Sequence, residues 1–171
     1  MRAVVLASGS VFLVGEGTIW VSRGYKLVDK GECNWILGIA VTRDRQKRQI
    51  YLSQELYINN ICDEHSSYMD SSNVRNFDIP ASPDVVNYSQ ADCPAEGSSE
   101  QIEMRLLAAI YMRLVGACIW LTTCTRFDVS YATSIHSRFT INPSKKHFSS
   151  LMRLLIYLRK DASRPLGPLD P

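Results

Sequence analysis

The stretch that decides the fold is residues 100–124, EQIEMRLLAAIYMRLVGACIWLTTC. Its apolar residues recur every three or four positions, which is the spacing of one face of an α-helix. The stretch therefore predicts a long helix that begins near Glu100. The face that we expect to turn inward consists of Met104, Leu107, Ala108, Tyr111, Leu114, Val115, Cys118 and Ile119.

A membrane-spanning helix is the alternative for this stretch, because residues 106–124 carry a single charge, Arg113. An arginine near the middle of a membrane helix costs roughly 2.5–3.5 kcal/mol on insertion scales. Thr122 and Thr123 and the lack of flanking aromatic belts also oppose insertion. We therefore expect a core helix and no stable membrane insertion.

Two further helices are predicted after the long one. Thr125, followed three residues later by Asp128, fits a capping box and predicts a helix over residues 125–139. Asn142 as the cap, with Pro143 at the first helical position, predicts a last helix. The inward face of this last helix is predicted to be Phe148, Leu151, Leu154, Leu155 and Leu158.

The region before the long helix has the pattern of strands. Residues 34–41, NWILGIAV, are too few for a typical helix and predict a strand that a charged loop connects to QIYL at 49–52. Ser53 then caps a predicted helix over residues 54–65. The turn of the predicted hairpin carries Arg43, Arg45, Lys47 and Arg48, and the inward face of the helix is Tyr57, Ile58, Ile61 and Cys62.

These patterns predict an α+β fold in five segments: a leader (1–22), a β-hairpin with one helix (23–65), an acidic flexible linker (66–99), a three-helix bundle (100–160) and a frayed tail (161–171). The linker lacks periodicity and contains three prolines, which is typical of a long exposed connection. As the reverse-transcriptase resemblance described below implies that the hairpin has lost its parent palm sheet, we also expect an exposed apolar edge and marginal stability.

The leader, Met1 to Ser22, has two interpretations. Arg2 followed by a mostly apolar stretch is typical of a short secretory signal. The same residues also fit two short strands with a hairpin around Gly15–Gly17. A functional signal would make the protein secreted, whereas strands would leave it inside the cell.

The charges are strongly segregated although the net charge is only +2. Residues 1–52 sum to +4, residues 53–104 to −9, and residues 105–171 to +7. A compact fold of such a chain would leave one basic face, which phosphate contact requires. The alternative is scattered, solvated charges on helix surfaces.

The five cysteines and three histidines exclude two protein classes. The cysteines are odd in number and lack a CxxC motif, which excludes a disulfide miniprotein, and no Cys/His spacing fits a zinc finger. Cysteines near apolar helical positions are typical of reduced core thiols. A Cys124–His136 dyad is the alternative to a buried thiol at Cys124.

Several blocks in register carry a family resemblance: YKLVDKGE at 25–32, ILGI at 36–39, IYLSQ at 50–54, RLVG at 113–116 and TRFDV at 125–129. From Tyr25 to Lys160 the chain resembles the reverse transcriptase region of copia-type retrotransposon polyproteins. It departs at Phe127, where the family has proline, and at Ile156, where a basic residue is usual. The resemblance implies the last palm strands, the thumb and the start of the connection.

The resemblance also implies contacts with a nucleic-acid duplex. It identifies the segment with Trp35, Leu37, Gly38 and Ile39 as a primer-grip-like strand, and the later helices as thumb helices that lie along the duplex. Binding would be weak, independent of sequence and sensitive to salt. The implied phosphate-binding residues are Arg43, Arg45, Lys47, Arg48, Lys145 and Lys146.

We expect no polymerase activity from this chain. The family's reaction uses two Mg²⁺ ions held by carboxylates, one of them in a Tyr-Val-Asp-Asp turn, and this sequence contains no Asp-Asp pair. The expected function is that of a non-catalytic protein, truncated relative to the reverse transcriptase and without a cofactor.

A second hypothesis comes from a weaker resemblance to secreted RxLR effectors of oomycete plant pathogens. Residues 23–26, RGYK, and then 29–32, DKGE, echo the Arg-x-Leu-Arg motif and the acidic patch of those proteins, although Arg-x-Leu-Arg itself is absent. Such an effector would act without catalysis on host-cell proteins.

Overall fold

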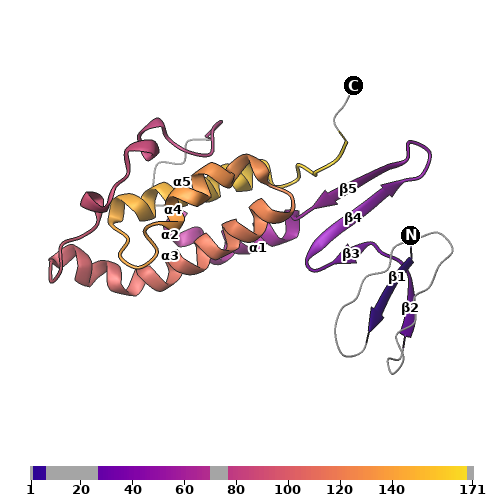
Figure 1. Cartoon of the computed structure of the whole chain (residues 1–171), viewed down its shortest axis with the longest axis horizontal. Coiled ribbons are helices and arrows are strands. Elements are labelled where there is room, and N and C mark those ends of the chain that lie inside the picture. Colours follow the sequence, from indigo (N-terminus) through magenta and orange to yellow (C-terminus); the bar gives the residue numbers. More distant parts are fainter. Residues whose placement is uncertain (1, 7–26, 70–76, 169–171) are drawn as a thin grey trace. The chain divides into compact units, whose positions relative to one another are not determined.

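The computed structural model describes residues 2–6, 27–69 and 77–168 (Figure 1). The chain divides into two compact units, one formed by residues 1–52 with 167–171 and the other by residues 53–166. Strands make up the first unit and helices the second, which confirms the predicted α+β class.

The N-terminal unit contains two small antiparallel sheets. β1 (Arg2–Leu6) pairs with β2 (Leu27–Glu32), and the other sheet has the order β3 (Trp35–Ile36), β4 (Ile39–Asp44), β5 (Gln49–Ser53). Part of the leader thus forms a strand, whereas the hairpin predicted around Gly15–Gly17 lies outside the described residues.

The apolar run 34–41 forms a hairpin of its own, so the single strand predicted there is wrong. The chain reverses at Leu37 and Gly38, whose φ angles of 50° and 81° are both positive. Two successive positive φ angles are typical of the tight turn that joins two antiparallel strands. The second hairpin, β4–β5, is confirmed, and Asp44 Oδ1 accepts a hydrogen bond from Lys47 N (2.9 Å) in its turn.

The helical unit is a bundle in which α3 packs against α4 and α5, and α1 packs against α5 (Figure 1). Its elements are α1 (Glu55–Glu64), α2 (Ser66–Met69), η1 (Pro83–Asn87), η2 (Gln90–Asp92), α3 (Ser99–Cys124), η3 (Phe127–Val129), α4 (Ser130–Ser137) and α5 (Lys145–Lys160).

The predicted inward faces form most of the core of this unit. All five apolar residues predicted for α5 are buried, as are Ile58, Ile61 and Cys62 of α1. On α3 the prediction is wrong at Ile119, which is 48% exposed, while Leu121 is buried in its place. By length and composition alone α3 could also cross a membrane, a property that core helices share.

The predicted caps of the last two helices are wrong. Thr125 ends α3, and its hydroxyl donates to Gln54 Oε1 (2.7 Å), while Asp128 accepts hydrogen bonds from Arg126. The cap of α5 is Ser144 rather than Asn142, because the Ser144 hydroxyl accepts a hydrogen bond from the backbone of the third helical residue.

Described parts of the predicted linker and tail contribute residues to the core. Val85 and Tyr88, in and beside η1, are 1% and 4% exposed and pack against Phe139. In the tail, Ala162 is 5% exposed and belongs to the main core. Apolar residues without helical or strand periodicity can therefore still pack into the core.

Candidate nucleic-acid interface

The four predicted cations are all exposed: Arg45, Lys47 and Arg48 lie in the β4–β5 turn, and Arg43 lies near the end of β4. Arg45 forms an ion pair with Glu32, and its hydrogen bond and its positive charge lower the pKa of that carboxyl group. Within the described residues, the other three cations form no ion pair, although the charge of Arg43 also lowers the pKa of Glu32. Three exposed cations in and beside the turn are therefore without an ion-pair partner among the described residues.

An open depression of about 790 Å³ lies beside this turn, with Asn34, Thr42, Arg43 and Tyr51 in its lining. The neighbouring β3–β4 hairpin exposes Trp35 by 51% and Leu37 by 62%. An exposed indole ring can stack on an unpaired base, and cations can contact phosphates. The N-terminal unit thus combines the two kinds of group that bind nucleic acid without reading its sequence.

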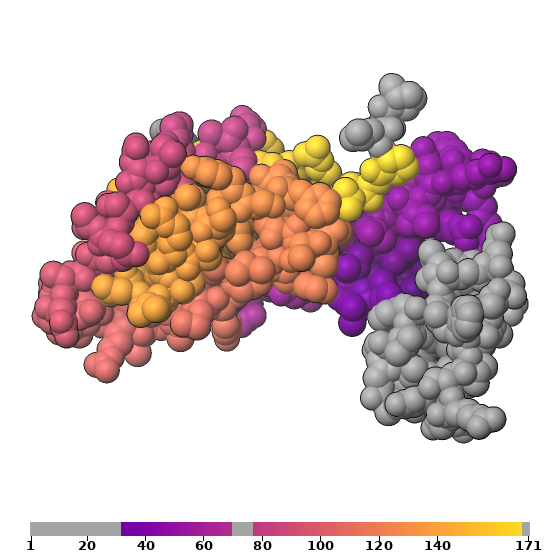
Figure 2. Space-filling view, in the orientation of Figure 1, coloured from indigo at the N-terminus to yellow at the C-terminus, as the bar shows by residue number. Residues whose placement is uncertain are grey.

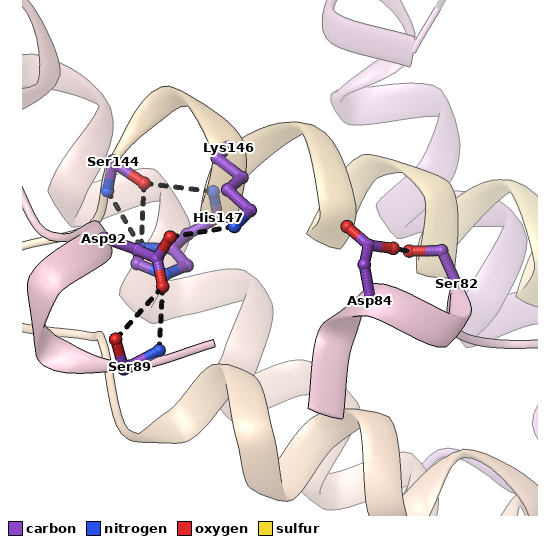
Figure 3. Close-up of polar contacts among 7 residues, drawn as sticks. All are labelled: Ser82, Asp84, Ser89, Asp92, Ser144, Lys146 and His147. Atoms are coloured by element: carbon purple, nitrogen blue, oxygen red, sulfur yellow. Dashed lines mark hydrogen bonds and ion pairs between the residues drawn. The ribbon is translucent and has the colours of Figure 1, made fainter. Parts of the chain in front are cut away.

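The other two predicted cations, Lys145 and Lys146, lie at the start of α5 and both have carboxylate partners. Lys145 pairs with Glu103 of α3. Lys146 Nζ lies 2.8 Å from Asp92 Oδ1 (Figure 3). It also lies 4.4 Å from the centroid of the Tyr88 ring. These contacts raise the pKa of both lysines, but they also neutralise the charge that a phosphate would need.

Asp92 is the centre of this cluster. Its carboxylate accepts hydrogen bonds from Lys146 and from the backbone N–H of Ser89 (2.8 Å), which together lower its pKa to about 2 (Figure 3). Next to it, Ser144 N donates to Nδ1 of the buried His147 (3.1 Å). These contacts hold η2 against the start of α5, so the cluster has a structural role and is not an open anion site.

Ion pairs of the same kind run through the whole helical unit. They join the acidic middle of the sequence to its basic C-terminal part: Glu64–Arg113, Asp63–Arg159, Asp78–Lys160, Asp92–Lys146 and Glu103–Lys145. Charges that are segregated in the sequence therefore meet in space at these five pairs.

The TRFDV block at residues 125–129 has a structural role in this chain at Arg126 and Asp128. The Arg126 side chain is 2% exposed, and its Nε and Nη2 donate to the two oxygens of Asp128 at 3.0 and 2.8 Å. Tyr157 Oη also donates to this carboxylate (2.8 Å), and both contacts lower its pKa against the opposing effect of burial.

His136 is held by Tyr111 and Ser150, and its described hydrogen bonds do not include Cys124. The Tyr111 hydroxyl lies 3.1 Å from His136 Nδ1, and burial lowers the pKa of the imidazole to about 4. Burial also raises the pKa of the Cys124 thiol. A catalytic cysteine–histidine pair needs a lowered thiol pKa and an imidazole that readily takes up the proton. The pKa shifts of Cys124 and His136 are in the opposite directions.

The buried cysteines have the character expected of core thiols. Burial raises the pKa of Cys62 to about 11 and that of Cys118 to about 12, so both are protonated at neutral pH. In the part of the chain that the structure describes, no cluster of three or more His, Cys, Asp or Glu residues could hold a metal ion.

Comparison with known proteins relates the chain to a transposon polyprotein. It is 28% identical over 141 residues to the retrovirus-related Pol polyprotein from transposon TNT 1-94 of Nicotiana tabacum. The match covers 81% of the chain, which spans only about a tenth of the length of that curated relative. No family model and no solved structure matches. The homology supports a retrotransposon-derived protein.

Proposed function

We propose that this protein is a non-catalytic derivative of a copia-type reverse transcriptase that binds the nucleic-acid backbone weakly and without sequence preference. The observation that carries the proposal is the β4–β5 turn, with three exposed cations that have no carboxylate partner among the described residues. The exposed Trp35 on the adjacent hairpin supports it. Lys145 and Lys146 no longer belong to the proposed interface, because each has a carboxylate partner.

Binding should be measured by fluorescence anisotropy with a labelled duplex at several salt concentrations. Each phosphate contact contributes about 0.9 to the slope of log K against log salt concentration on B-form DNA. The triple variant Arg43→Gln, Lys47→Gln, Arg48→Gln should therefore have a slope smaller by about 2.7. Its affinity should fall equally for unrelated sequences, because backbone contacts carry no sequence information.

The matched control is the double variant Lys145→Gln, Lys146→Gln, which also removes positive charge from the surface. It should leave the slope unchanged, because these lysines already have carboxylate partners. Equal losses in the two variants would show that binding depends on net charge and not on the turn. Absence of binding by the unaltered protein at low salt would overturn this part of the proposal.

The non-catalytic part rests on the sequence, which has no Asp-Asp pair to hold two Mg²⁺ ions. A primer-extension assay with Mg²⁺ and the full chain tests it. We expect no extended primer, and any extension that purified protein supports would contradict this part.

The secreted-effector alternative depends on cleavage within residues 1–22. Such cleavage would remove β1, the strand partner of β2, and this pairing favours retention of the segment. Mass spectrometry of the mature N-terminus, in cells and in medium, tests it directly. A chain that begins after residue 6 and is found in the medium would favour the effector.

A further inference from the structure

Residues 82–93, which contain η1 and η2, form a segment that we call the strap. Figure 2 shows the strap, coloured pink, at the surface of the helical unit. Its buried apolar residues, Val85 and Tyr88, form a small cluster with Phe139 that is separate from the main core. A segment that is anchored in this way can open while the bundle stays folded, because its release leaves the main core covered.

The strap is held at the first turn of α5. Tyr88 meets the ring of His147 edge to face, with the ring centroids 5.3 Å apart, and Phe139 stacks on the same ring at 4.0 Å. His147 is completely buried, and its Nε2 has no hydrogen-bond partner among the described residues. One residue earlier in α5, Lys146 pairs with Asp92 of η2 (Figure 3). The anchoring of the strap therefore depends on how α5 begins.

His147 also completes the cap of α5. It occupies the third helical position, where a capping box normally has Glu or Gln. The backbone N–H of Ser144 donates to His147 Nδ1 (3.1 Å), and the backbone N–H of His147 donates to the Ser144 hydroxyl (3.3 Å; Figure 3). Nδ1 can accept this hydrogen bond only while it carries no proton. The cap therefore requires the neutral form of the imidazole.

We propose that His147 is a pH switch: when its Nδ1 takes up a proton from solvent, the cap of α5 is lost and the strap is released from the bundle. The N–H of Ser144 then faces another N–H instead of a lone pair. The new positive charge also joins Lys145 and Lys146 in a first turn without acidic residues, and cations are unfavourable at the N-terminus of a helix.

Titratable groups surround His147 on several elements. Burial lowers the pKa of His147 most strongly and Lys146 lowers it further, while Asp92 and Glu100 raise it, and the net shift is downward. The groups that face it are Tyr88 after η1, Asp92 of η2, Glu100 of α3, His136 of α4 and Lys146 of α5.

The direction of the switch follows from this shift. The pKa of His147 is below 6.5 while the strap is closed, so the open form binds the proton more readily. The closed form is therefore fully stable above about pH 6.5 and loses stability as the pH falls below that value. The carboxyl group of Asp92 has a pKa of about 2 and stays charged in this range. Its pair with Lys146 thus resists release and does not cause it.

Hydrogen exchange of the full chain, followed by NMR between about pH 7 and 4.5, tests the proposal. The amides of Tyr88, Asp92 and Cys93 donate to carbonyl oxygens within the strap and report its opening. Their protection factors, corrected for the intrinsic exchange rate at each pH, should fall below about pH 6.5 by up to about tenfold per pH unit. Amides in the middle of α3 should stay protected. Constant protection of the strap, or equal losses in the strap and α3, would overturn the proposal.

His147→Gln is the main variant, because glutamine can accept the same hydrogen bond in a capping box and does not titrate. Protection of its strap should no longer depend on pH. His65→Gln is the matched control, since it replaces a buried histidine at the end of α1 that contacts Ile61 and Arg113. The control should keep the pH dependence of the unaltered chain. The same dependence in His147→Gln would contradict the proposal.

Glutamine lacks the ring that Tyr88 contacts, so a second measurement covers a His147→Gln strap that is open at every pH. NMR titration of the His147 ring in the unaltered chain must then show a change at the same pH as the protection of Asp92. A ring that titrates while the strap stays closed would exclude the switch. His136→Gln should keep the pH dependence of the strap, and its loss in this variant alone would place the switch at His136 instead.

Discussion

The two units of this protein differ in how they bury apolar side chains. In the helical unit, Tyr111 of α3 and Leu151 and Leu158 of α5 are completely buried. In the N-terminal unit, none of the described side chains between residues 32 and 52 is fully buried. Three helices each contribute an apolar face to the core of the helical unit, so they cover one another's apolar side chains. Two small sheets cannot do so without a covering layer.

The largest expected effect is a core truncation in the helical unit. Leu154→Ala removes a completely buried side chain of α5 and should lower the free energy of unfolding by about 2–5 kcal/mol. Trp35→Ala, in the N-terminal unit, should change it by less than about 0.5 kcal/mol, because the ring is half exposed. Urea denaturation followed by circular dichroism measures both, and equal effects would contradict the comparison.

Acid should destabilise the helical unit in particular. Burial lowers the pKa of His136 from 6.5 to about 4 in the folded chain. Between these values the unfolded chain binds more protons, so stability falls as the pH drops from about 6.5 to about 4, by at most about 3 kcal/mol. All three histidines lie in this unit. His136→Gln should flatten the dependence of the urea midpoint on pH, and an unchanged slope would exclude His136 as the cause.

Loss of the Arg126 ion pair should have an intermediate effect. Asp128→Asn leaves a nearly buried guanidinium without its carboxylate, which should lower the free energy of unfolding by about 1–3 kcal/mol. Lys160→Gln removes an exposed pair with Asp78 and serves as the control, with an expected loss of about 0–1 kcal/mol. Thermal unfolding of the two variants should rank them in this order.

The smallest expected effect is a gain in the N-terminal unit. Leu37 has φ 50°, which leucine adopts reluctantly and asparagine tolerates. Leu37→Asn should therefore stabilise the β3–β4 hairpin by a few tenths of a kcal/mol. Exchange of the Val41 amide, which donates to Asn34 O (2.9 Å), should slow. Gly38→Ala, at φ 81°, should accelerate it, and the same change in both variants would disprove this explanation.

Much of the helical unit is predictable from sequence, because helical periodicity identifies a buried face without knowledge of the partner. The reversal at Leu37 and Gly38 is hidden in the sequence, because apolar residues on both sides of it make a continuous run. The cap of α5 is ambiguous in the sequence, because Asn142 and Ser144 are both good capping residues and only the fold selects between them.

The sequence identifies the cations of the candidate interface, but it does not show which of them have a carboxylate partner in the fold. Lys146 and Asp92 are 54 residues apart in the chain, so their pairing depends on the fold. The turn cations can be placed more reliably, because a hairpin tip is exposed in almost any packing. Sequence therefore indicates where positive charge lies, and the tertiary contacts determine whether it is free.

The contact between α1 and α5 has a consequence for synthesis of the chain. Cys62 of α1 donates its thiol hydrogen to the carbonyl oxygen of Leu155, 93 residues later. At synthesis rates of about 5–20 residues per second, α1 waits roughly 5–20 s after it leaves the ribosome before α5 exists. During that time the apolar face of α1 is open to chaperones and to neighbouring nascent chains, so the synthesis of α5 determines when α1 becomes protected.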